Sequence, residues 1–438
     1  MSPEKILYKT KPLENWAWGK ELRTKHYKSI MTAKDDGKTL TSGSAHARIL
    51  AAGLPNYVHL SGEPFGATIA TMPELAQECA EAAEAQGFSR DMCAYMRLYW
   101  GASFLNKSPW GKFPKPDLGV QSAICDSHAK WHQMMTEYMG IPFFVVEVPQ
   151  YYPALAPPHP SMIEYTAEQF MDMPPWMEGV TGQKWDDEKF ITALLRLNRI
   201  HVLWAEICTL NQNVPAPLDL KSMYSLYWPA AGGDINEDTE AFYRALKDEV
   251  QHRVDEGIAA LATERCRLMH ENQPPWYALY IFRYMEGFGA VTNCGGYVFA
   301  LGGAFDLVDD EQGNPHLITE TPVEQLEPRP KNREESMYLM AKLHFGRYRF
   351  VTSPDAKRKI AVAMADDWKC NGAIIMLNRG CEGLSVGQTE ARLALIDAGV
   401  PTMVYEANMA DKREWDDREV RDRLDSYMES LGLKKLED

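Results

Sequence analysis

Residues 118–149, LGVQSAICDSHAKWHQMMTEYMGIPFFVVEVP, decide the fold of this chain. GVQSAI predicts a strand, residues 127–139 predict a helix that ends at Gly140, and PFFVVEV predicts a second strand. The last run is apolar without alternation, which is typical of a strand buried on both faces of a parallel sheet. The stretch therefore predicts a βαβ unit with Cys125 in the turn between its first strand and its helix.

A second stretch of the sequence repeats this plan. The run AIIMLN leads to Cys381, a helix over 386–398 ends at Gly399, and VPTMVYE follows as a strand. Two units of this kind predict two similar α/β domains that face one another. Because ligands of open α/β sheets gather beyond the carboxyl ends of the strands, both turns indicate a site between the domains.

The remainder of the 438 residues divides around these units. The segment PNYVHL predicts the first strand, and the proline-rich stretch 148–160 marks a boundary. Apolar residues at three- and four-residue intervals over 187–212 and 236–263 predict helices. We therefore expect four parts: an N-terminal helical segment (1–45), a first α/β domain (46–160), a helical bridge (161–263) and a second α/β domain with a C-terminal helix (264–438).

Composition excludes several functional classes. A formal net charge of −15 argues against a nucleic-acid partner, which needs a basic surface. The N-terminus has no long apolar run, and no stretch reaches the roughly 18 apolar residues of a membrane span. We expect a cytoplasmic protein with reduced thiols and no membrane partner. The pattern GxxxxGK[ST] is missing, so we expect this chain to bind no nucleotide itself.

The cysteines give the first indication of chemistry. Cys93, Cys125 and Cys381 lie at chain turns, where thiolates could hold an iron–sulfur cluster; the alternative is that they are small buried hydrophobic residues. Three thiolates would leave one iron of a cubane without a protein ligand. Cys294 ends a strand before two glycines and could be a fourth ligand or line the cavity. The other cysteines are interpreted as structural: Cys79, Cys208, Cys266 and Cys370.

Two residues are candidate acid–base groups. His128 lies three residues after Cys125, in the first turn of the predicted helix, and is the preferred proton donor. Glu63 lies in SGEPFG after the first predicted strand and is the second candidate; a loop carboxylate in water is the alternative.

The motifs around these cysteines resemble those of a known family. DMCAYMRLYWG, ICDSHAKW and MLNRGCE are similar in order and spacing to the three cysteine motifs of the 2-hydroxyacyl-CoA dehydratase and benzoyl-CoA reductase family. Further similarity lies in SGEPFGATIA, in ENQPPWYALYIFRYMEGFGAVTN and in the tail VPTMVYEANMADKREWDDREVRDRL. The resemblance extends over roughly residues 45–430.

The resemblance implies a fold, a cofactor and partners. It implies two flavodoxin-like (Rossmann-type) domains with added helices, and a [4Fe–4S] cluster held by Cys93, Cys125 and Cys381 with one open or non-protein position. It also implies a related smaller cluster-bearing subunit. A separate ATPase activator with its own [4Fe–4S] cluster, supplied by ferredoxin, would deliver single electrons of very negative potential. The substrate would be an acyl-CoA thioester.

Within the family, the sequence favours the reductase branch. Where dehydratases show characteristic motifs, this chain has SGSAHARIL, SAICDSHAK and QPPW, and EANMADKREW resembles the larger, B-type subunit of ATP-dependent benzoyl-CoA reductase. The expected reaction is a two-electron reduction of an aromatic acyl-CoA to a cyclic dienoyl-CoA. Two alternatives remain: a subunit of a (R)-2-hydroxyacyl-CoA dehydratase, and a non-catalytic electron-transfer or double-cubane cluster protein.

Overall fold

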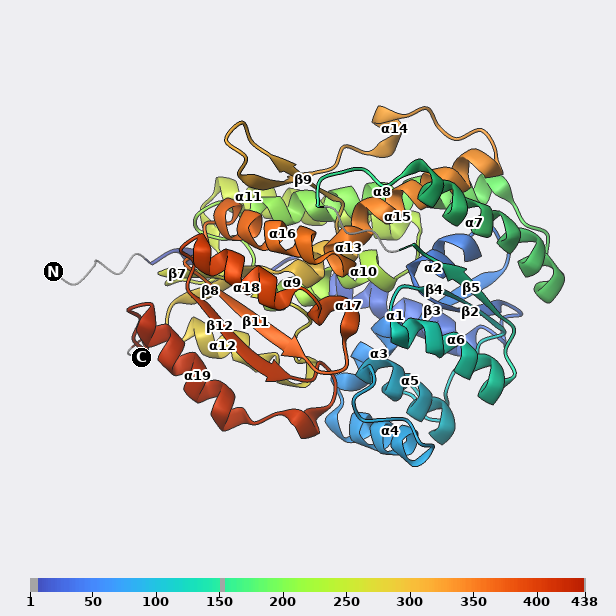
Figure 1. Cartoon of the computed structure of the whole chain (residues 1–438), viewed down its shortest axis with the longest axis horizontal. Coiled ribbons are helices and arrows are strands. Elements are labelled where there is room, and N and C mark those ends of the chain that lie inside the picture. The colour runs from blue at the N-terminus through green and yellow to red at the C-terminus, as the bar shows by residue number, and fades with distance from the viewer. Residues whose placement is uncertain (1–6, 150–153, 437–438) are drawn as a thin grey trace.

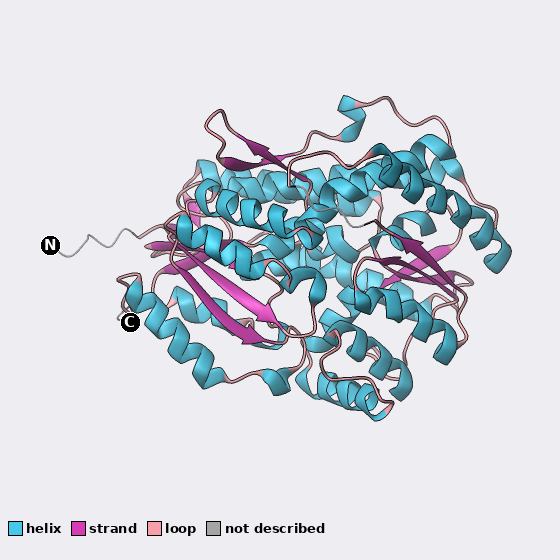
Figure 2. Cartoon of the chain, in the orientation of Figure 1, coloured by secondary structure: helices cyan, strands magenta, loops and turns pink. Residues whose placement is uncertain are grey.

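The computed structural model describes residues 7–149 and 154–436, and it contains two separate four-stranded parallel sheets with helices packed around them (Figures 1 and 2). The first sheet has the order β3-β2-β4-β5. Its strands are β2 (Thr39–Gly43), β3 (Tyr57–Ser61), β4 (Leu118–Ala123) and β5 (Phe143–Glu147). Its helices are α2 (Ala45–Ala51), α3 (Gly62–Ala70), α4 (Pro73–Ala85), α5 (Ala94–Leu105) and α6 (Asp126–Met139).

The second sheet has the order β12-β11-β7-β8. Its strands are β7 (Cys266–Glu271), β8 (Ala290–Cys294), β11 (Gly372–Asn378) and β12 (Thr402–Ala407). Its helices and short 3₁₀ turns are η1 (Trp276–Ala278), α12 (Tyr280–Glu286), α13 (Gly296–Gly302), α16 (Pro354–Asp367), α17 (Glu382–Ser385), α18 (Gln388–Asp397), η2 (Lys412–Glu414) and α19 (Asp417–Ser430).

Further helices and short strand pairs complete the described part of the chain (Figure 1). The helices are α1 (Trp16–Thr32), α7 (Pro160–Thr181), α8 (Asp187–Leu210), α9 (Leu220–Leu226), α10 (Trp228–Gly232), α11 (Glu237–Asp255), α14 (Val323–Leu326) and α15 (Arg333–Thr352). The strand pairs are β1 (Lys9–Thr10) with β6 (Ile258–Ala259), and β9 (Phe305–Asp309) with β10 (Pro315–Thr319).

Both large sheets share one topology. When the strands of each sheet are numbered in chain order, both read 2-1-3-4 across the sheet, which is the flavodoxin-like arrangement. The chain therefore folds as two flavodoxin-like α/β units, as the sequence predicts. In each sheet the connections change direction between the first and third strands, which are β2 and β4 in one sheet and β7 and β11 in the other. Ligands of such sheets bind at this switch point.

The predicted strands GVQSAI, PFFVVEV, AIIMLN and VPTMVYE are confirmed as β4, β5, β11 and β12. The prediction of a helical segment over residues 1–45 is wrong at its end, because Thr39–Gly43 forms β2 and lies inside the first sheet between β3 and β4. Its sequence, TLTSG, is too short and polar for hydrophobic periodicity to reveal.

Candidate functional site

The three predicted cysteine ligands lie at the N-termini of three helices. Cys93 is the N-cap residue of α5, Cys125 of α6 and Cys381 of α17. All three line one cavity of about 170 Å³, together with the predicted acid–base residues Glu63 and His128. The structure therefore brings all five residues into one place. The partial positive charge of a helix N-terminus stabilises a thiolate there.

The cavity lies at the switch points of both sheets. Cys125 follows β4 and Cys381 follows β11, so the third strand of each sheet supplies one thiol. Cys93 differs, because α5 follows the helix α4 rather than a strand. The convergence of segments from both halves of the chain depends on how the two sheets face each other.

Two of the thiols, Cys93 and Cys381, are poorly suited to be charged in the absence of a cation. Burial raises the pKa of Cys93, and the neighbouring Cys381 and Cys125 raise it further. Burial also raises the pKa of Cys381, although a hydrogen bond from Gln273 opposes the shift. A bound metal centre reverses this balance, because it holds a coordinating thiol in its deprotonated form. The chemistry of this donor set therefore fits a metal-based group.

The spacing of the thiols argues against a single metal ion. In the described ranges, the one set of three His, Cys, Asp or Glu ligand atoms within 4.8 Å of one another belongs to His316, Asp366 and Asp367. The three sulfurs of Cys93, Cys125 and Cys381 are thus spread more widely. A zinc ion with bonds of about 2.3 Å would hold its sulfurs roughly 3.8 Å apart. A cluster of several irons spans a larger gap and fits better.

Gln273 is a residue of the site that the sequence alone did not reveal. It follows β7, and its Nε2 donates a hydrogen bond to Cys381 Sγ at 3.0 Å. Its Oε1 accepts from Asn378 Nδ2 at 3.0 Å, so the amide orientation is fixed from behind. Its place just after RCRLMHE, at a strand end, is the signal that could have identified it.

His128 joins a thiol to a carboxylate. Its Nδ1 lies 2.9 Å from Cys125 Sγ, and its Nε2 hydrogen-bonds Glu63. Burial lowers the pKa of His128, but Cys125 and Glu63 outweigh it and raise that pKa well above the ordinary range. Burial would likewise raise the pKa of Glu63, but the hydrogen bond with His128 lowers it overall. Glu63 lies in the first turn of α3, not in the loop that the sequence predicts.

Two contacts tie the cysteine-bearing segments of the two halves together. Glu382 Oε2 accepts a hydrogen bond from the backbone N–H of Asp126 at 3.1 Å. The residue that follows Cys381 therefore caps α6, the helix that begins after Cys125. Gly380 has a φ of +71°, and a Cβ there would lie 2.5 Å from the carbonyl oxygen of Asp91. Only glycine permits this approach beside Cys93.

Lys357 anchors the segment that follows Cys381. Its Nζ donates to the carbonyl oxygens of Gly383, Leu384 and Val386 at 2.8, 3.2 and 2.5 Å. The side chain is buried, and burial lowers the pKa of Lys357 to about 8. These bonds satisfy carbonyl groups at the end of the short helix α17, which could not hold its own shape by propensity alone.

Two serines add hydroxyl groups near the strand ends. Ser44 directly follows β2, and Ser61 is the last residue of β3. Ser61 also lines the thiol cavity. The Oγ of each is buried and has no hydrogen-bond partner among the described residues. Buried hydroxyls without partners are costly, so these two are suited to contact a bound molecule.

Cys294 does not belong to the group that lines the thiol cavity. It is fully buried, and its Sγ lies 3.6 Å from Cys370 Sγ. Cys79, Cys208 and Cys266 are also buried, in agreement with a structural role.

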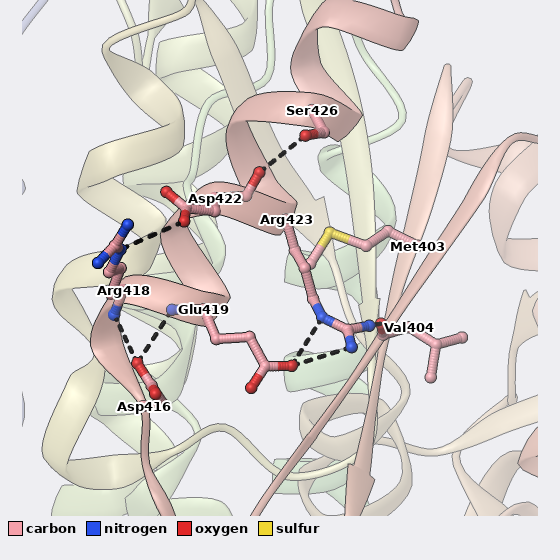
Figure 3. A pocket seen from close by; sticks show the side chains of 8 residues that line it. All are labelled: Met403, Val404, Asp416, Arg418, Glu419, Asp422, Arg423 and Ser426. Atoms are coloured by element: carbon pink, nitrogen blue, oxygen red, sulfur yellow. Dashed lines mark hydrogen bonds and ion pairs between the residues drawn. The ribbon is translucent and has the colours of Figure 1, made fainter.

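A further hollow lies between the edge strand β12 and α19 (Figure 3), with a volume of about 520 Å³. Its charged side chains pair with one another: Arg423 Nη2 lies 2.9 Å from Glu419 Oε1, and Arg418 Nε lies 3.7 Å from Asp422 Oδ2. None of the cysteines lines it. The thiol cavity is therefore the stronger candidate.

In the part of the chain that is described, no helix is both long and apolar enough to cross a membrane.

Comparison with known proteins agrees with this geometry. The family described as "2-hydroxyglutaryl-CoA dehydratase, D-component" matches residues 49–431. The chain is 26% identical to the (R)-2-hydroxyisocaproyl-CoA dehydratase alpha subunit of Clostridioides difficile, over 82% of each chain. It is 23% identical to the (R)-phenyllactyl-CoA dehydratase alpha subunit of Clostridium sporogenes, over 82% of this chain and 81% of that one. The B-type subunit of the benzoyl-CoA reductase of Thauera aromatica is 22% identical, over 81% of this chain and 79% of that one.

Proposed function

Because this chain belongs to the 2-hydroxyglutaryl-CoA dehydratase D-component family, we propose that it is the iron–sulfur subunit of an enzyme that transforms an acyl-CoA thioester. Cys93, Cys125 and Cys381 would hold a [4Fe–4S] cluster that leaves one iron open. The observation that carries this proposal is the meeting of three helix-capping thiols at one cavity. When bound, such a cluster would supply single electrons of low potential.

The residues around the cavity have separate tasks in this proposal. Gln273 and the backbone N–H of His128 donate to thiolate sulfurs, which stabilises the charge that the cysteines carry as ligands. Tyr95, Tyr227 and Tyr297 line the wall and exclude water from the acyl group. His128, with Glu63 behind it, holds a proton beside the place where the acyl group would lie.

The reaction that we put first is reduction of an aromatic acyl-CoA to a cyclic dienoyl-CoA, as in an ATP-dependent benzoyl-CoA reductase. The similarity to the Thauera aromatica reductase and the reductase-like sequence EANMADKREW support it. A ring that accepts an electron needs an enclosed cavity and a positioned acid, and the tyrosine wall and His128 meet both needs.

The second reaction is dehydration of a (R)-2-hydroxyacyl-CoA. The unpaired hydroxyls of Ser44 and Ser61 favour it, because they could hydrogen-bond the substrate hydroxyl or the thioester carbonyl. The similarity to dehydratase alpha subunits also favours it.

ATP consumption separates the two reactions. We expect the partners to be a related smaller subunit and an ATPase activator supplied by ferredoxin. A reductase then consumes ATP at every turnover, whereas a dehydratase that recycles its electron consumes only catalytic amounts. Anaerobic assay of the purified complex with benzoyl-CoA and with 2-hydroxyacyl-CoA substrates, with ATP counted per product, decides between them.

The cluster itself is tested by Cys381→Ala. We expect this variant to lose most of its iron and the spin-resonance signal of the reduced protein, because one of three ligands is gone. Cys294→Ala is the matched control, since Cys294 is buried outside the cavity, and it should keep both. Full iron content in Cys381→Ala, measured anaerobically, would overturn the assignment.

His128 is tested by His128→Gln. Glutamine keeps a polar side chain beside Cys125 but cannot deliver the proton, so we expect normal iron content and a turnover about 10²- to 10⁴-fold lower. Metal analysis and single-turnover kinetics measure the two effects separately. An unchanged rate would remove His128 from the reaction.

A further inference from the structure

Two cysteines outside the thiol cavity lie in contact with each other. Cys294 ends β8, Cys370 lies between α16 and β11, and their Sγ atoms are 3.6 Å apart. The sulfurs of a disulfide are about 2.0 Å apart, so a small shift of the two side chains would close the bond. In the described part of the chain, no third His, Cys, Asp or Glu ligand atom lies within 4.8 Å of both sulfurs. The pair therefore does not resemble a structural zinc site, which has four ligands, and is suited to disulfide chemistry.

Cys370 is the member of the pair that solvent can reach. It is partly exposed, and its neighbours in the chain, Lys369 and Asn371, are exposed as well. Cys294 is fully buried. A small disulfide that arrives from solution would therefore meet Cys370 first.

Asn293 holds the thiol of Cys370 beside Cys294. Its Oδ1 accepts a hydrogen bond from Cys370 Sγ at 3.6 Å. Its Nδ2 donates to the carbonyl oxygens of Trp368 and Asn211 at 3.1 and 3.3 Å, which fixes the orientation of the amide. The two sulfurs are thus positioned for each other before any reaction takes place.

Cys294 has the properties of a resolving thiol, which reacts second. Burial raises the pKa of Cys294 well above its ordinary value, the neighbouring Cys370 raises it further, and the positive charge of Arg267 opposes the shift. A buried thiol of this kind does not meet a disulfide in solution. It can attack a mixed disulfide that has formed on Cys370, because that sulfur lies directly beside it.

The chain after Cys294 connects this pair to the thiol cavity. Gly295 follows directly, and a Cβ there would lie 2.8 Å from the carbonyl oxygen of His270, so the backbone packs tightly against β7. Tyr297, in the first turn of α13, lines the thiol cavity. A displacement of Cys294 is therefore passed on to the cavity wall.

We propose that Cys294 and Cys370 form a reversible disulfide by exchange with a low-molecular-weight disulfide, and that this modification shifts α13 at the wall of the thiol cavity. In the first step the Cys370 sulfur attacks the small disulfide, whose S–S bond breaks and releases one thiol. In the second step Cys294 attacks the Cys370 sulfur and releases the other thiol. Overall, two protein thiols are oxidised to one disulfide, the small disulfide is reduced to two thiols, and the two protons go to the released thiols.

Thiol mapping of the full-length, anaerobically purified chain tests the proposal. The probe is a series of buffers with different ratios of glutathione to glutathione disulfide, prepared without oxygen. After each incubation the free thiols are blocked, the chain is digested, and linked peptides are identified by mass spectrometry. We expect a Cys294–Cys370 link whose fraction follows the buffer ratio as a two-electron couple and which disappears on treatment with dithiothreitol.

Single substitutions separate the two roles. Cys294→Ala should stop the reaction after its first step, so that glutathione remains attached to Cys370. Cys370→Ala should acquire neither a link nor glutathione at Cys294. Cys79→Ala is the matched control, because Cys79 is also buried but lies on α4 in the other half of the molecule. It should form the link as the unaltered chain does.

Hydrogen exchange tests the connection to the cavity. Contraction of the sulfur pair strains the tight packing after Cys294, so we expect the amides of α13 to exchange faster in the oxidised chain than in the reduced chain. Unchanged exchange in α13 would overturn the coupling to the cavity wall. Absence of a Cys294–Cys370 link at every buffer ratio, or a link from Cys370 to Cys266 instead, would overturn the modification site itself.

Discussion

At the scale of single residues, the site consists of ionisable groups whose removal from water is unfavourable unless they gain a partner. Three partly buried thiols, a buried lysine and a buried carboxyl group surround one small region of the molecule. Lys357 relieves its burial through three carbonyl oxygens, and the thiols would gain their partner from a bound cluster. Residues kept at such a cost are typical of functional sites.

Glu271, at the end of β7, provides a prediction about pH. It is 9% exposed, and burial raises the pKa of Glu271 to about 7, although Lys357 nearby opposes the shift. A carboxyl group with a raised pKa holds its proton in the folded state after the unfolded chain has released it, so stability falls as pH rises from about 4.5 to 7.

Glu271→Gln removes this loss, because the amide does not ionise. From pH 6 to pH 8 we expect the stability of the variant relative to the unaltered chain to increase by about 1 kcal/mol. Denaturant unfolding at the two pH values measures the difference. A stability difference that is the same at both values would show that Glu271 does not titrate in this range.

At the scale of elements, short segments with little intrinsic stability carry the cysteines. The helix α17 has only four residues, and the turn before it bends through Gly380 against the segment before Cys93. The shape of this region comes from tertiary contacts, because a helix this short is unstable alone. Changes in these contacts should therefore affect the metal site before they affect the global fold.

Gly380→Ala tests this dependence. The positive φ alone costs about 1 kcal/mol, and the added Cβ would overlap the carbonyl oxygen of Asp91. We expect separation of Cys381 from Cys93 and a loss of iron. Gly313→Ala is the control, because Gly313 has a φ of +85° but no atom within 4 Å of an added Cβ. Gly313→Ala should lose a similar amount of stability through the strain of its positive φ, but it should keep its iron. Iron loss in both variants would contradict the explanation.

At the scale of the whole molecule, a buried ionic network joins the two sheets. Arg97 on α5 is fully buried, and its Nη1 lies 2.9 Å from Glu84 and 3.2 Å from Asp411, which follows β12. Arg413 also contacts Asp411, at 2.6 Å. Burial alone would raise the pKa of Asp411, but Arg413 and Arg97 lower it to about 2. The network fixes the helix that begins at Cys93 against the half of the molecule that carries Cys381.

Arg97→Met should break this connection. Removing one partner of a buried ion pair typically costs several kcal/mol, and we expect about 3 kcal/mol because Arg413 still neutralises Asp411. Thermal unfolding measures the loss. Lys107→Met removes an exposed ion pair with Glu78 and should cost less than about 1 kcal/mol. Equal losses in the two variants would show that the network does not join the halves.

The sequence by itself determined the two parallel α/β units, because apolar runs, helix-ending glycines and turn cysteines are local signals that need no knowledge of distant contacts. It also indicated His128 and Glu63 as candidate acid–base groups. It missed β2, a five-residue segment with Leu40 as its one large apolar side chain, which forms a strand only because β3 and β4 flank it.

Only the tertiary structure decided which side chains meet. Gln273 and Cys381 are 108 residues apart, and their hydrogen bond depends on the pairing of β7 with β11. The hydrogen bond between Arg347 and His201 likewise depends on the packing of α15 against α8. Residue types and local periodicity do not encode such distances, because these distances arise from the way whole elements pack together.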